Sequence, residues 1–376
     1  MRETLRSFLF AVYLKSMKET VGVGIIGTGF ARRVQIPGFL ACENARVISV
    51  ASGSIENARS TAEEFDIGHY TADWKETAAH AEVDIVCITT PPVYHKEMAL
   101  FAIEHGKHLL CEKPMAMNVA EAEEMAAAAK TAGVLALIDH ELRFQHGRQT
   151  AYALLRLGEI GKVRHAKYLF QAPHRGDPDI PWNWWSDIEA GGGALGAITS
   201  HIIDSFQWFL NTDVSSVFCQ LQTHVKQRKD SSGTSREVTA DDQSNMLLRF
   251  AASELTSDAT GLVSVSMTEG PNYMNRLEFF GEDGALRITH RGEVFVAKSG
   301  EKEWRQIEVE LGTNIEGVPD TGFARAFMSF APKIVDAIAR GEKSIEYGAT
   351  FDDGVRVQRV LDAARESSAT GCVRNV

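Results

Sequence analysis

Hydrophobic residues in the first third of the chain form short continuous runs that alternate with segments of helical periodicity. Continuous apolar runs are typical of strands buried on both faces of a sheet, and apolar positions three or four residues apart are typical of the helices that cover it. Strands that alternate with helices favour a parallel sheet. The pattern predicts strands at 21–26, 46–51, 84–89, 108–111 and 134–139, and helices at 31–40, 56–65, 93–104 and 119–131.

The rhythm of the chain changes after Arg143. A helix at 147–156 and a strand at 163–171 lead into a tryptophan-rich loop and a glycine-opened helix that ends at Leu210. Longer strands then follow one another through short turns, which favours antiparallel pairing. We expect these strands at 214–224, 245–250, 261–267, 275–281, 285–290 and 293–297, with closing helices at 323–339 and 351–368.

The sequence therefore predicts an α/β protein of two domains, a parallel-sheet domain at 21–142 and an α/β domain with an open, mainly antiparallel sheet at 143–376. A chain of 376 residues exceeds what one core usually serves, in agreement with this division. Residues 1–20 are expected to form an N-terminal extension. Its apolar run after Arg6 resembles a signal peptide, but no small-residue cleavage site follows, so an extension ahead of a start near Met17 is favoured over export.

Composition excludes several classes of partner. The chain carries 39 basic and 50 acidic residues, a net charge of −11, without the basic stripe that nucleic-acid binding needs. No apolar run reaches the roughly eighteen residues that span a membrane. The five cysteines are odd in number and scattered, which is typical of buried thiols in a reducing compartment. We expect a cytoplasmic protein without disulfides or a metal cluster, and without nucleic-acid or membrane partners.

A glycine turn, Gly27-Thr28-Gly29, follows the first predicted strand and precedes a helix. In this context a glycine pattern predicts dinucleotide binding, because the first glycine permits the turn and the second lets a pyrophosphate approach the backbone and the helix N–H groups. The third small position is Arg32, which is able to reach a phosphate, while Ala31 provides some of the close packing. An ordinary strand-to-helix turn is the alternative, but the alternation that follows favours a Rossmann domain.

The end of the second predicted strand bears on the choice of cofactor. An acidic residue there would bind the ribose 2′-hydroxyl of NAD, whereas this chain has Ser52 and Ser54. Both hydroxyls can donate to a 2′-phosphate, and Arg59, in the following helix, can pair with it. Arg59 is explained equally well as a solvated charge on the helix face. The sequence favours NADP and leaves NAD open.

The segment Cys111-Glu112-Lys113-Pro114 lies at the end of the predicted strand at 108–111, where open α/β sheets bind their ligands. The proline forces a sharp exit and is compatible with a cis peptide bond. A partly desolvated amine at this edge can exchange or share a proton with a substrate hydroxyl. Lys113 is therefore the first catalytic candidate.

Three tryptophans, Trp182, Trp184 and Trp185, lie within one short loop before Gly191-Gly192-Gly193. An indole offers a flat apolar face and one N–H donor, which suits the C–H faces and hydroxyls of a sugar. The glycines allow the backbone to pass close to substrate or cofactor. We expect these tryptophans and the preceding His174 to contribute to the substrate site, with at least one indole anchoring the loop.

From Val21 onward the chain resembles the glucose-fructose oxidoreductase, inositol dehydrogenase and MocA (Gfo/Idh/MocA) family. The resemblance implies a Rossmann domain, a second domain whose open sheet forms dimer or tetramer contacts, and hydride transfer between a nicotinamide cofactor and a sugar, cyclitol or polyol carbon. It is carried by Gly27-Thr28-Gly29-Phe30, Thr90-Pro91 with His95, Glu112-Lys113-Pro114, Arg143-Phe144, Gly158-Glu159-Ile160-Gly161, and Gly191-Gly192-Gly193 through His201 and Asp204.

The resemblance also implies roles for single residues. Lys113 matches the lysine that contacts the reacting oxygen, and His201 matches the histidine that acts as general acid or base. Arg143 is implied at the substrate, and cofactor contacts are implied at Phe30, Thr90, Pro91, His95 and Glu112.

One position departs from the family pattern. The family often has an aspartate one helical turn before the histidine, and this chain has Ala197 there, so His201 lacks that carboxylate partner on its own helix. Asp204, Asp177 and Asp179 are possible substitutes, but a structural role is favoured for each of them.

Three functions are compatible with these residues. The leading one is an NAD(P)-dependent oxidoreductase acting on a sugar-like alcohol or carbonyl. Transient oxidation followed by elimination or epimerisation, with a recycled cofactor, is a second. A nucleotide-binding sensor without catalysis is a third, and the presence of both Lys113 and His201 argues against it.

Overall fold

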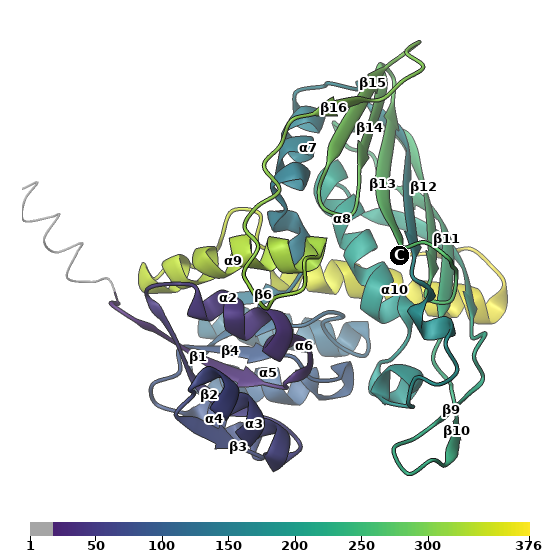
Figure 1. The fold of residues 1–376 in the computed structure, drawn as a ribbon. Coiled ribbons are helices and arrows are strands. Elements are labelled where there is room, and N and C mark those ends of the chain that lie inside the picture. The colour runs from purple at the N-terminus through teal and green to yellow at the C-terminus, as the bar shows by residue number, and fades with distance from the viewer. Residues whose placement is uncertain (1–17) are drawn as a thin grey trace, which may run out of the picture.

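Two β-sheets organise the chain, which a computed structural model describes over residues 18–376 (Figure 1). The predicted N-terminal extension lies outside the described residues, apart from residues 18–20. The two sheets belong to the first and the second parts of the sequence, as the change of rhythm after Arg143 indicates.

The first sheet has six strands, all parallel, in the order β3-β2-β1-β4-β5-β6. This order confirms the Rossmann prediction and reverses between β1 and β4, the position at which such sheets bind ligands. The strands are β1 (Val21–Ile26), β2 (Ala45–Ala51), β3 (His69–Thr71), β4 (Ile85–Ile88), β5 (His108–Cys111) and β6 (Ala136–Ile138).

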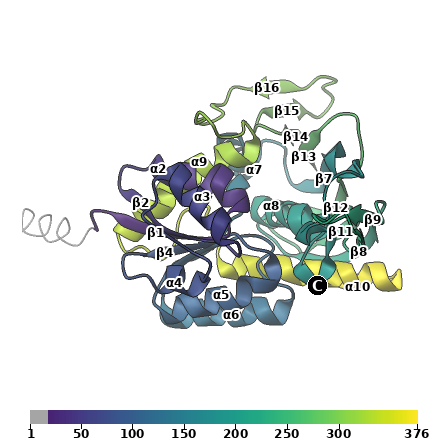
Figure 2. The ribbon, with the colours of Figure 1, turned by 60° about the horizontal axis from the view of Figure 1, so that its bottom comes forward.

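Helices lie on both faces of this sheet (Figures 1 and 2). The predicted helix at 31–40 is a π-helical turn, Ala31–Gln35, continued by α2 (Ile36–Leu40). The prediction lacked β3 and α4, which are too short to show a period; the side chain of Asp73, which accepts a hydrogen bond from the N–H of Lys75 and so caps α4, is the only local signal. The others are α3 (Ile55–Phe65), α4 (Trp74–Ala79), α5 (His95–Glu104) and α6 (Val119–Ala132).

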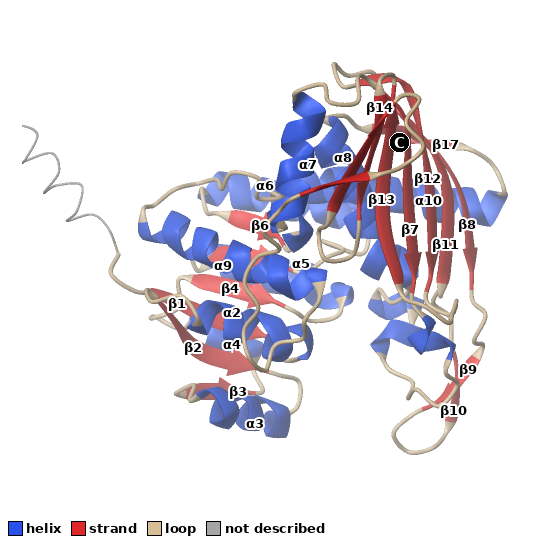
Figure 3. Cartoon of the chain, turned by 45° about the horizontal axis from the view of Figure 1, so that its top comes forward, coloured by secondary structure: helices blue, strands red, loops and turns tan. Residues whose placement is uncertain are grey.

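The second sheet has nine strands in the order β16-β15-β14-β13-β7-β12-β11-β8-β17 (Figure 3). It is mainly antiparallel, as predicted, with one parallel pair between β7 and β12. The short strands β9, β10, β16 and β17 were not predicted. β9 (Gln227–Lys229) and β10 (Ser235–Glu237) pair with each other in a separate two-stranded hairpin. The nine strands of the sheet are β7 (Val163–Gln171), β8 (Val214–Gln222), β11 (Gln243–Phe250), β12 (Thr256–Ser266), β13 (Met274–Gly281), β14 (Gly284–Ile288), β15 (Val294–Lys298), β16 (Arg305–Ile307) and β17 (Arg374–Asn375).

One face of the second sheet packs against α7 (His146–Arg156) and α8 (Ser200–Leu210), which carries His201. Phe206 and Phe209 of α8 are fully buried against Tyr168 and Phe279 of the sheet. Burying an aromatic side chain of this size contributes about 1.5–3 kcal/mol. This packing fixes α8, and with it the position of His201.

The last two helices connect the two parts of the molecule. Helix α9 (Gly322–Ala339) packs Phe327 and Phe330 into the core of the first sheet, where Phe330 stacks on Phe144 at 4.1 Å between ring centroids. Helix α10 (Phe351–Thr370) contacts both α6 and β8 and extends under both parts in Figure 2. Phe323, at the start of α9, lies beside the space between the two sheets.

All five cysteines are free thiols, and the four at 42, 87, 111 and 219 are buried. Burial raises the pKa of Cys87 and Cys111 well above the usual value, so these thiols behave as small hydrophobic side chains, as predicted. None of the helices within residues 18–376 combines the length and the apolar character that crossing a membrane requires.

Candidate active site

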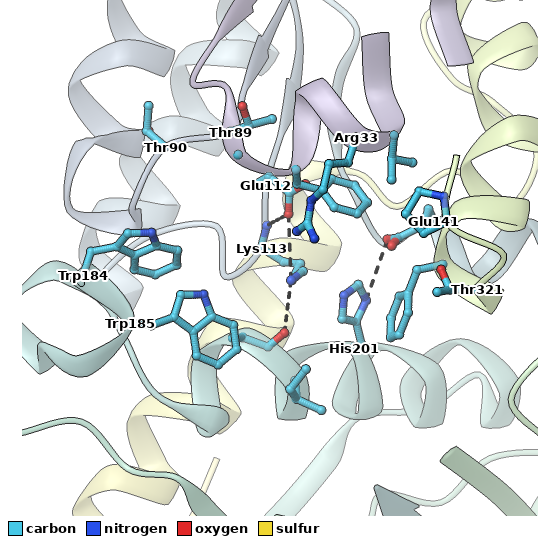
Figure 4. Close-up of a pocket in the computed structure, with 17 residues that line it drawn as sticks. Arg33, Thr89, Thr90, Glu112, Lys113, Glu141, Trp184, Trp185, His201 and Thr321 are labelled. Carbon is cyan, nitrogen blue, oxygen red and sulfur yellow. Dashed lines mark hydrogen bonds and ion pairs between the residues drawn. The ribbon is translucent and has the colours of Figure 1, made fainter. Parts of the chain in front are cut away.

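A cavity of about 440 Å³ lies between the two sheets, at the carboxyl ends of β1, β4 and β5 (Figure 4). It brings together residues that are far apart in the sequence. Of the predicted site residues, those that line it are Gly29, Phe30, Thr90, Glu112, Lys113, Trp184, Trp185 and His201. Lining residues that the sequence analysis missed include Arg33, Thr89, Glu141, Thr321 and Phe323.

The glycine turn has the form that a dinucleotide requires. Gly27 has φ +99°, and a Cβ there would lie 2.6 Å from the carbonyl oxygen of Thr89, so only glycine fits. A Cβ on Gly29 would meet no atom within 4 Å, which means that the space over this backbone is open. Ala31 is fully buried beneath the turn. An open backbone at the start of a helix fits a pyrophosphate, so these residues, with Thr28 between the glycines, are suited to hold a dinucleotide.

Arg32 does not face the cavity. Its guanidinium pairs with Glu64 and donates to Ser60 at 3.2 Å, both on α3. The expectation that Arg32 reaches a phosphate is therefore not supported by its contacts. Its neighbour Arg33 lines the cavity instead.

The residues expected to select the cofactor lie at the end of β2 and the start of α3, outside the cavity lining. Ser54 caps α3, with its hydroxyl accepting a hydrogen bond from the N–H of Asn57 at 3.3 Å. Ser52 accepts from the N–H of Ser54 at 3.4 Å, and Arg59 is exposed. The preference for NADP stays a prediction.

Lys113 connects the two parts of the molecule. The Lys113–Pro114 peptide bond is cis, and the amine donates a hydrogen bond to the carbonyl oxygen of Ala197 at 3.0 Å. A carboxylate oxygen of Glu112 lies 3.9 Å from the same nitrogen. An ammonium has three donors, so this geometry leaves N–H groups for a ligand in the cavity.

His95 was expected among the cofactor contacts, but it lies outside the cavity and is fully buried. Its ring nitrogens lie 3.1 Å from the carbonyl oxygen of Pro114 and 2.9 Å from that of Thr90. Burial lowers its pKa, so the ring is neutral. His95 connects the Thr90-Pro91 turn to the lysine motif and so supports the site from behind.

Three buried carboxylates, Glu112, Asp139 and Glu141, gather next to Lys113. The side-chain amide of Gln35 donates to Asp139 at 2.7 Å and to Glu112 at 3.3 Å. Burial raises the pKa of all three acids. Repulsion from Glu112 raises the pKa of Asp139 further, and repulsion from Asp139 and Glu112 raises that of Glu141 further. The cluster therefore holds protons that exposed acids would have lost.

His201, near the start of α8, lies in the cavity wall beside these acids. Its Nδ1 lies 3.4 Å from Nδ1 of His140 and 3.9 Å from a carboxylate oxygen of Glu141. Burial, then the nearby Lys113 charge, lowers the pKa of His201 well below the usual value, and burial lowers that of His140 to about 4. Both rings are neutral near pH 7, so His201 is able to accept a proton.

Arg143 was expected to bind substrate, and its contacts contradict this. Its side chain is 6 % exposed and lies outside the cavity lining. The guanidinium pairs with Asp204, at 3.0 Å from Nε, and lies 3.5 Å from Asp353. Asp204 is therefore occupied by Arg143 and does not serve as the missing partner of His201.

The tryptophan loop divides between two roles. Trp184 and Trp185 line the cavity, with ring centroids 5.9 Å apart. A Cβ on Gly192 would lie 2.6 Å from the carbonyl oxygens of both, so this glycine lets the loop pack there. The indole of Trp182 instead donates to the backbone carbonyl oxygen of Glu237 at 2.9 Å and anchors the loop to the β9–β10 hairpin.

His174 is the last predicted substrate residue that the cavity does not include; its side chain is exposed. The hydrogen bond of Trp182 to the β9–β10 hairpin confirms the prediction that at least one indole anchors the loop.

A dinucleotide turn, a lysine and a histidine around one cavity are compatible with a nicotinamide-dependent oxidoreductase, because side chains of these two types are able to exchange a proton. Comparisons with known families agree. The oxidoreductase family with an NAD-binding Rossmann fold, Gfo/Idh/MocA, matches residues 21–140, and the C-terminal domain of the same family matches residues 148–287. The chain belongs to the Gfo/Idh/MocA family and is an oxidoreductase that acts on CH–OH groups.

Relatives cover most of the chain. An uncharacterised oxidoreductase of Synechocystis is 32 % identical over 266 residues, 70 % of each chain. Levoglucosan dehydrogenase of Pseudarthrobacter phenanthrenivorans is 27 % identical over 390 residues, 93 % of this chain and 97 % of that one. A solved levoglucosan dehydrogenase complex with NADH and levoglucosan has a TM-score of 0.84 at 26 % identity, covering 95 % of this chain and 99 % of that one.

An oxidoreductase domain protein from Kribbella flavida has a TM-score of 0.85 at 28 % identity, covering 96 % of this chain and 100 % of that one. These likenesses agree with the predicted fold of both domains.

Proposed function

We propose that this enzyme is an NAD(P)-dependent dehydrogenase that oxidises a hydroxyl group of a sugar or a related polyol, or reduces the matching carbonyl. The observation that carries the proposal is the cavity in which Lys113, His201 and the open Gly29 turn meet. The levoglucosan dehydrogenase relatives support a sugar or an anhydro-sugar as the substrate class.

The chemistry follows from what the residues around the cavity do. A nicotinamide bound at the glycine turn supplies the hydride acceptor or donor. Lys113 directs its free N–H groups at the substrate oxygen, holding it in place and stabilising the charge that develops on it. His201 is neutral and accepts the hydroxyl proton, or returns it in the reverse direction. Trp184 and Trp185 cover the apolar face of the sugar and exclude water.

The proposal is tested by supplying levoglucosan, glucose and myo-inositol to the purified protein with NAD⁺ or NADP⁺. The expected result is a rise in absorbance at the reduced-nicotinamide band that matches the product formed. Product without that change would favour elimination or epimerisation with a recycled cofactor. Cofactor binding without turnover of any sugar or polyol would favour the sensor.

Replacing Trp184 by alanine is expected to raise the substrate KM about tenfold, because a sugar-facing aromatic contact contributes on the order of 1 kcal/mol. Trp182→Ala is the comparison, since that indole anchors the same loop from outside the cavity, and it should raise KM less than Trp184→Ala does. Initial rates against substrate concentration measure both. Equal effects of the two changes would make the whole loop scaffolding.

For the cofactor we propose NADP as the better ligand, because β2 ends without an acid that would repel a 2′-phosphate. NADPH should then bind at least as tightly as NADH in a fluorescence titration. Arg59→Ala should weaken the binding of NADPH about five- to tenfold and leave the binding of NADH unchanged, since the proposed contact of Arg59 is with the 2′-phosphate, which NADH lacks. Tighter binding of NADH to the unaltered enzyme would reject the preference.

We further propose that the enzyme assembles as a homodimer or homotetramer through the second sheet. Phe218 of β8 and Leu247 of β11 are paired neighbours on that sheet, and both are exposed. Apolar side chains side by side on an open sheet face support an interface there.

A further inference from the structure

The carboxylate nearest to His201 comes from a different element of the fold. Position 197, one turn before His201, carries only a methyl group. Glu141 begins the turn Glu141–Phe144 that follows β6, and its Oε2 lies 3.9 Å from Nδ1 of His201. Figure 4 shows the His201 ring between Lys113 and Glu141.

Glu141 is placed to exchange a proton. It lines the cavity, it is 2 % exposed, and its Oε2 has no hydrogen-bond partner among residues 18–376. A buried carboxylate oxygen without a donor is costly, because its lost hydration is not replaced. A proton delivered to Oε2 removes that cost. Since Nδ1 of His201 faces this oxygen, Nε2 is the ring nitrogen left for the substrate.

The alternative partner of His201 is His140, whose Nδ1 lies 3.4 Å away. Its pKa of about 4 prevents it from keeping a second proton near neutral pH. Its other nitrogen lies 3.9 Å from Asp204, whose charge Arg143 already balances. His140 orients the His201 ring, and the acid that is able to take the proton is Glu141.

Charged groups from several elements surround the pair and its neighbour His140. Lys113 and Arg148 oppose a positive charge on His201, and Asp139 and Glu112 oppose a negative charge on Glu141. Lys113 also favours the ionised form of Glu141, but burial and the two carboxylates outweigh it, so the surroundings favour the neutral imidazole together with the neutral acid. The groups that act on the pair are Glu112 and Lys113 after β5, Asp139 and His140 after β6, and Arg148 on α7. His140 in turn faces Arg143, Asp204 on α8 and Asp353 on α10.

We infer that Glu141 is the proton-accepting and positioning partner of His201, a role that rests on the proposed dehydrogenase function. In the oxidation, the substrate O–H bond breaks and its proton bonds to Nε2 of His201, while the Nδ1–H bond breaks and that proton bonds to Oε2 of Glu141. The O–H electron pair forms the C=O bond as the carbon releases its hydride to the nicotinamide. Apo distances of this size tighten when substrate binds.

The pair predicts a particular pH dependence. Burial and the neighbouring carboxylates raise the pKa of Glu141 well above its usual value, and burial lowers that of His201. When the pair carries one proton beyond the neutral imidazole and the ionised carboxylate, that proton is therefore bound to Glu141 and not to His201. Oxidation needs Glu141 ionised, so its rate falls as the pH drops through the raised pKa; reduction needs Glu141 protonated, so its rate rises there.

Glu141→Gln tests this inference, because glutamine keeps the shape of the side chain and accepts no proton. With levoglucosan as the probe, kcat for oxidation should fall about 100-fold. The acid limb of the pH profile should move to lower pH, since only His201, with its lowered pKa, then titrates. Glu141→Asp should keep the limb, with an intermediate rate. Glu104→Gln, an exposed acid at the end of α5, should match the unaltered enzyme.

A spectroscopic readout separates this inference from the proposed function. In ¹⁵N-histidine-labelled protein without substrate, the Nδ1 resonance of His201, assigned by its loss in His201→Asn, should follow the titration of Glu141. That titration should vanish in Glu141→Gln. An unchanged titration and an unchanged acid limb overturn the inference even if levoglucosan is oxidised. A titration that vanishes as expected, without turnover of any sugar, upholds the pair and overturns the proposed function.

Should Glu141→Gln fail to fold, as thermal unfolding and NADH binding would reveal, the unaltered protein and Glu141→Asp carry the test. The absence of any titration at Nδ1 of His201 above the usual carboxyl range would then overturn the inference.

Discussion

Replacing Lys113 by methionine is expected to lower kcat about 100- to 1000-fold, the usual effect of removing one donor from a developing oxyanion. Methionine matches the length of the lysine stem and lacks the ammonium. The amine uses one donor on the carbonyl oxygen of Ala197, and its remaining N–H groups face the cavity. Steady-state oxidation of levoglucosan, or of whichever sugar the unaltered enzyme turns over, measures the loss.

The control for this change is Lys333→Met, an exposed lysine on α9, which should leave turnover unchanged. NADH affinity should stay within about threefold in Lys113→Met if the lysine acts on the substrate oxygen and does not merely hold the cofactor. Loss of the bond to Ala197 should also lower the free energy of unfolding by about 1.5–3 kcal/mol, as for a hydrogen bond to a charged group. Turnover at the rate of the unaltered enzyme would remove Lys113 from the chemistry.

The parallel sheet was predictable because its strands are buried on both faces. All residues of β1 are buried, so the apolar run at 21–26 coincides with the strand, and β5 coincides with the run at 108–111. β3 has three residues and α4 has six, so neither is long enough to show a period. The parallel pairing of β7 with β12 joins segments far apart in the sequence and has no local signal.

The two predicted catalytic residues line one cavity, and for Lys113 its place could be predicted from the local sequence. Lys113 follows a strand, and the carboxyl end of a parallel strand is the ligand edge of the sheet. The same rule applies to Glu141, which comes shortly after β6, and would have selected it. Sequence spacing instead indicates partners for His201 on its own helix and in nearby loops.

Arg143 and His95 show what short motifs do not indicate. A motif predicts which residue stands at a position, but whether its side chain faces the cavity depends on what packs against it. Arg143 meets Asp353 from α10, far along the chain, and His95 meets the carbonyl oxygen of Pro114. Both side chains are turned away from the cavity by contacts that the sequence pattern does not specify.

Replacing Arg143 by methionine should therefore destabilise the protein and leave substrate binding unaltered. The side chains of Arg143 and Asp204 are 6 % and 3 % exposed, and removing one partner of such a pair leaves an uncompensated buried charge. The expected decrease in the free energy of unfolding is about 3–5 kcal/mol. Urea unfolding measures it, and Arg340→Met, an exposed arginine near Glu342, is the control that should change it little.

The pH dependence of this decrease distinguishes a lost ion pair from lost packing. Arg143 leads the interactions that hold the pKa of Asp353 below its usual value against the opposing effect of burial. A depressed pKa stabilises the fold above the unfolded value of about 4 and loses that contribution as pH falls through the folded value. In Arg143→Met the buried acids must ionise without a partner, so the deficit should be largest near pH 7 and shrink toward pH 4. A loss of unfolding free energy that is constant with pH would indicate lost packing alone. Unchanged stability together with a raised substrate KM would show that Arg143 binds substrate after all.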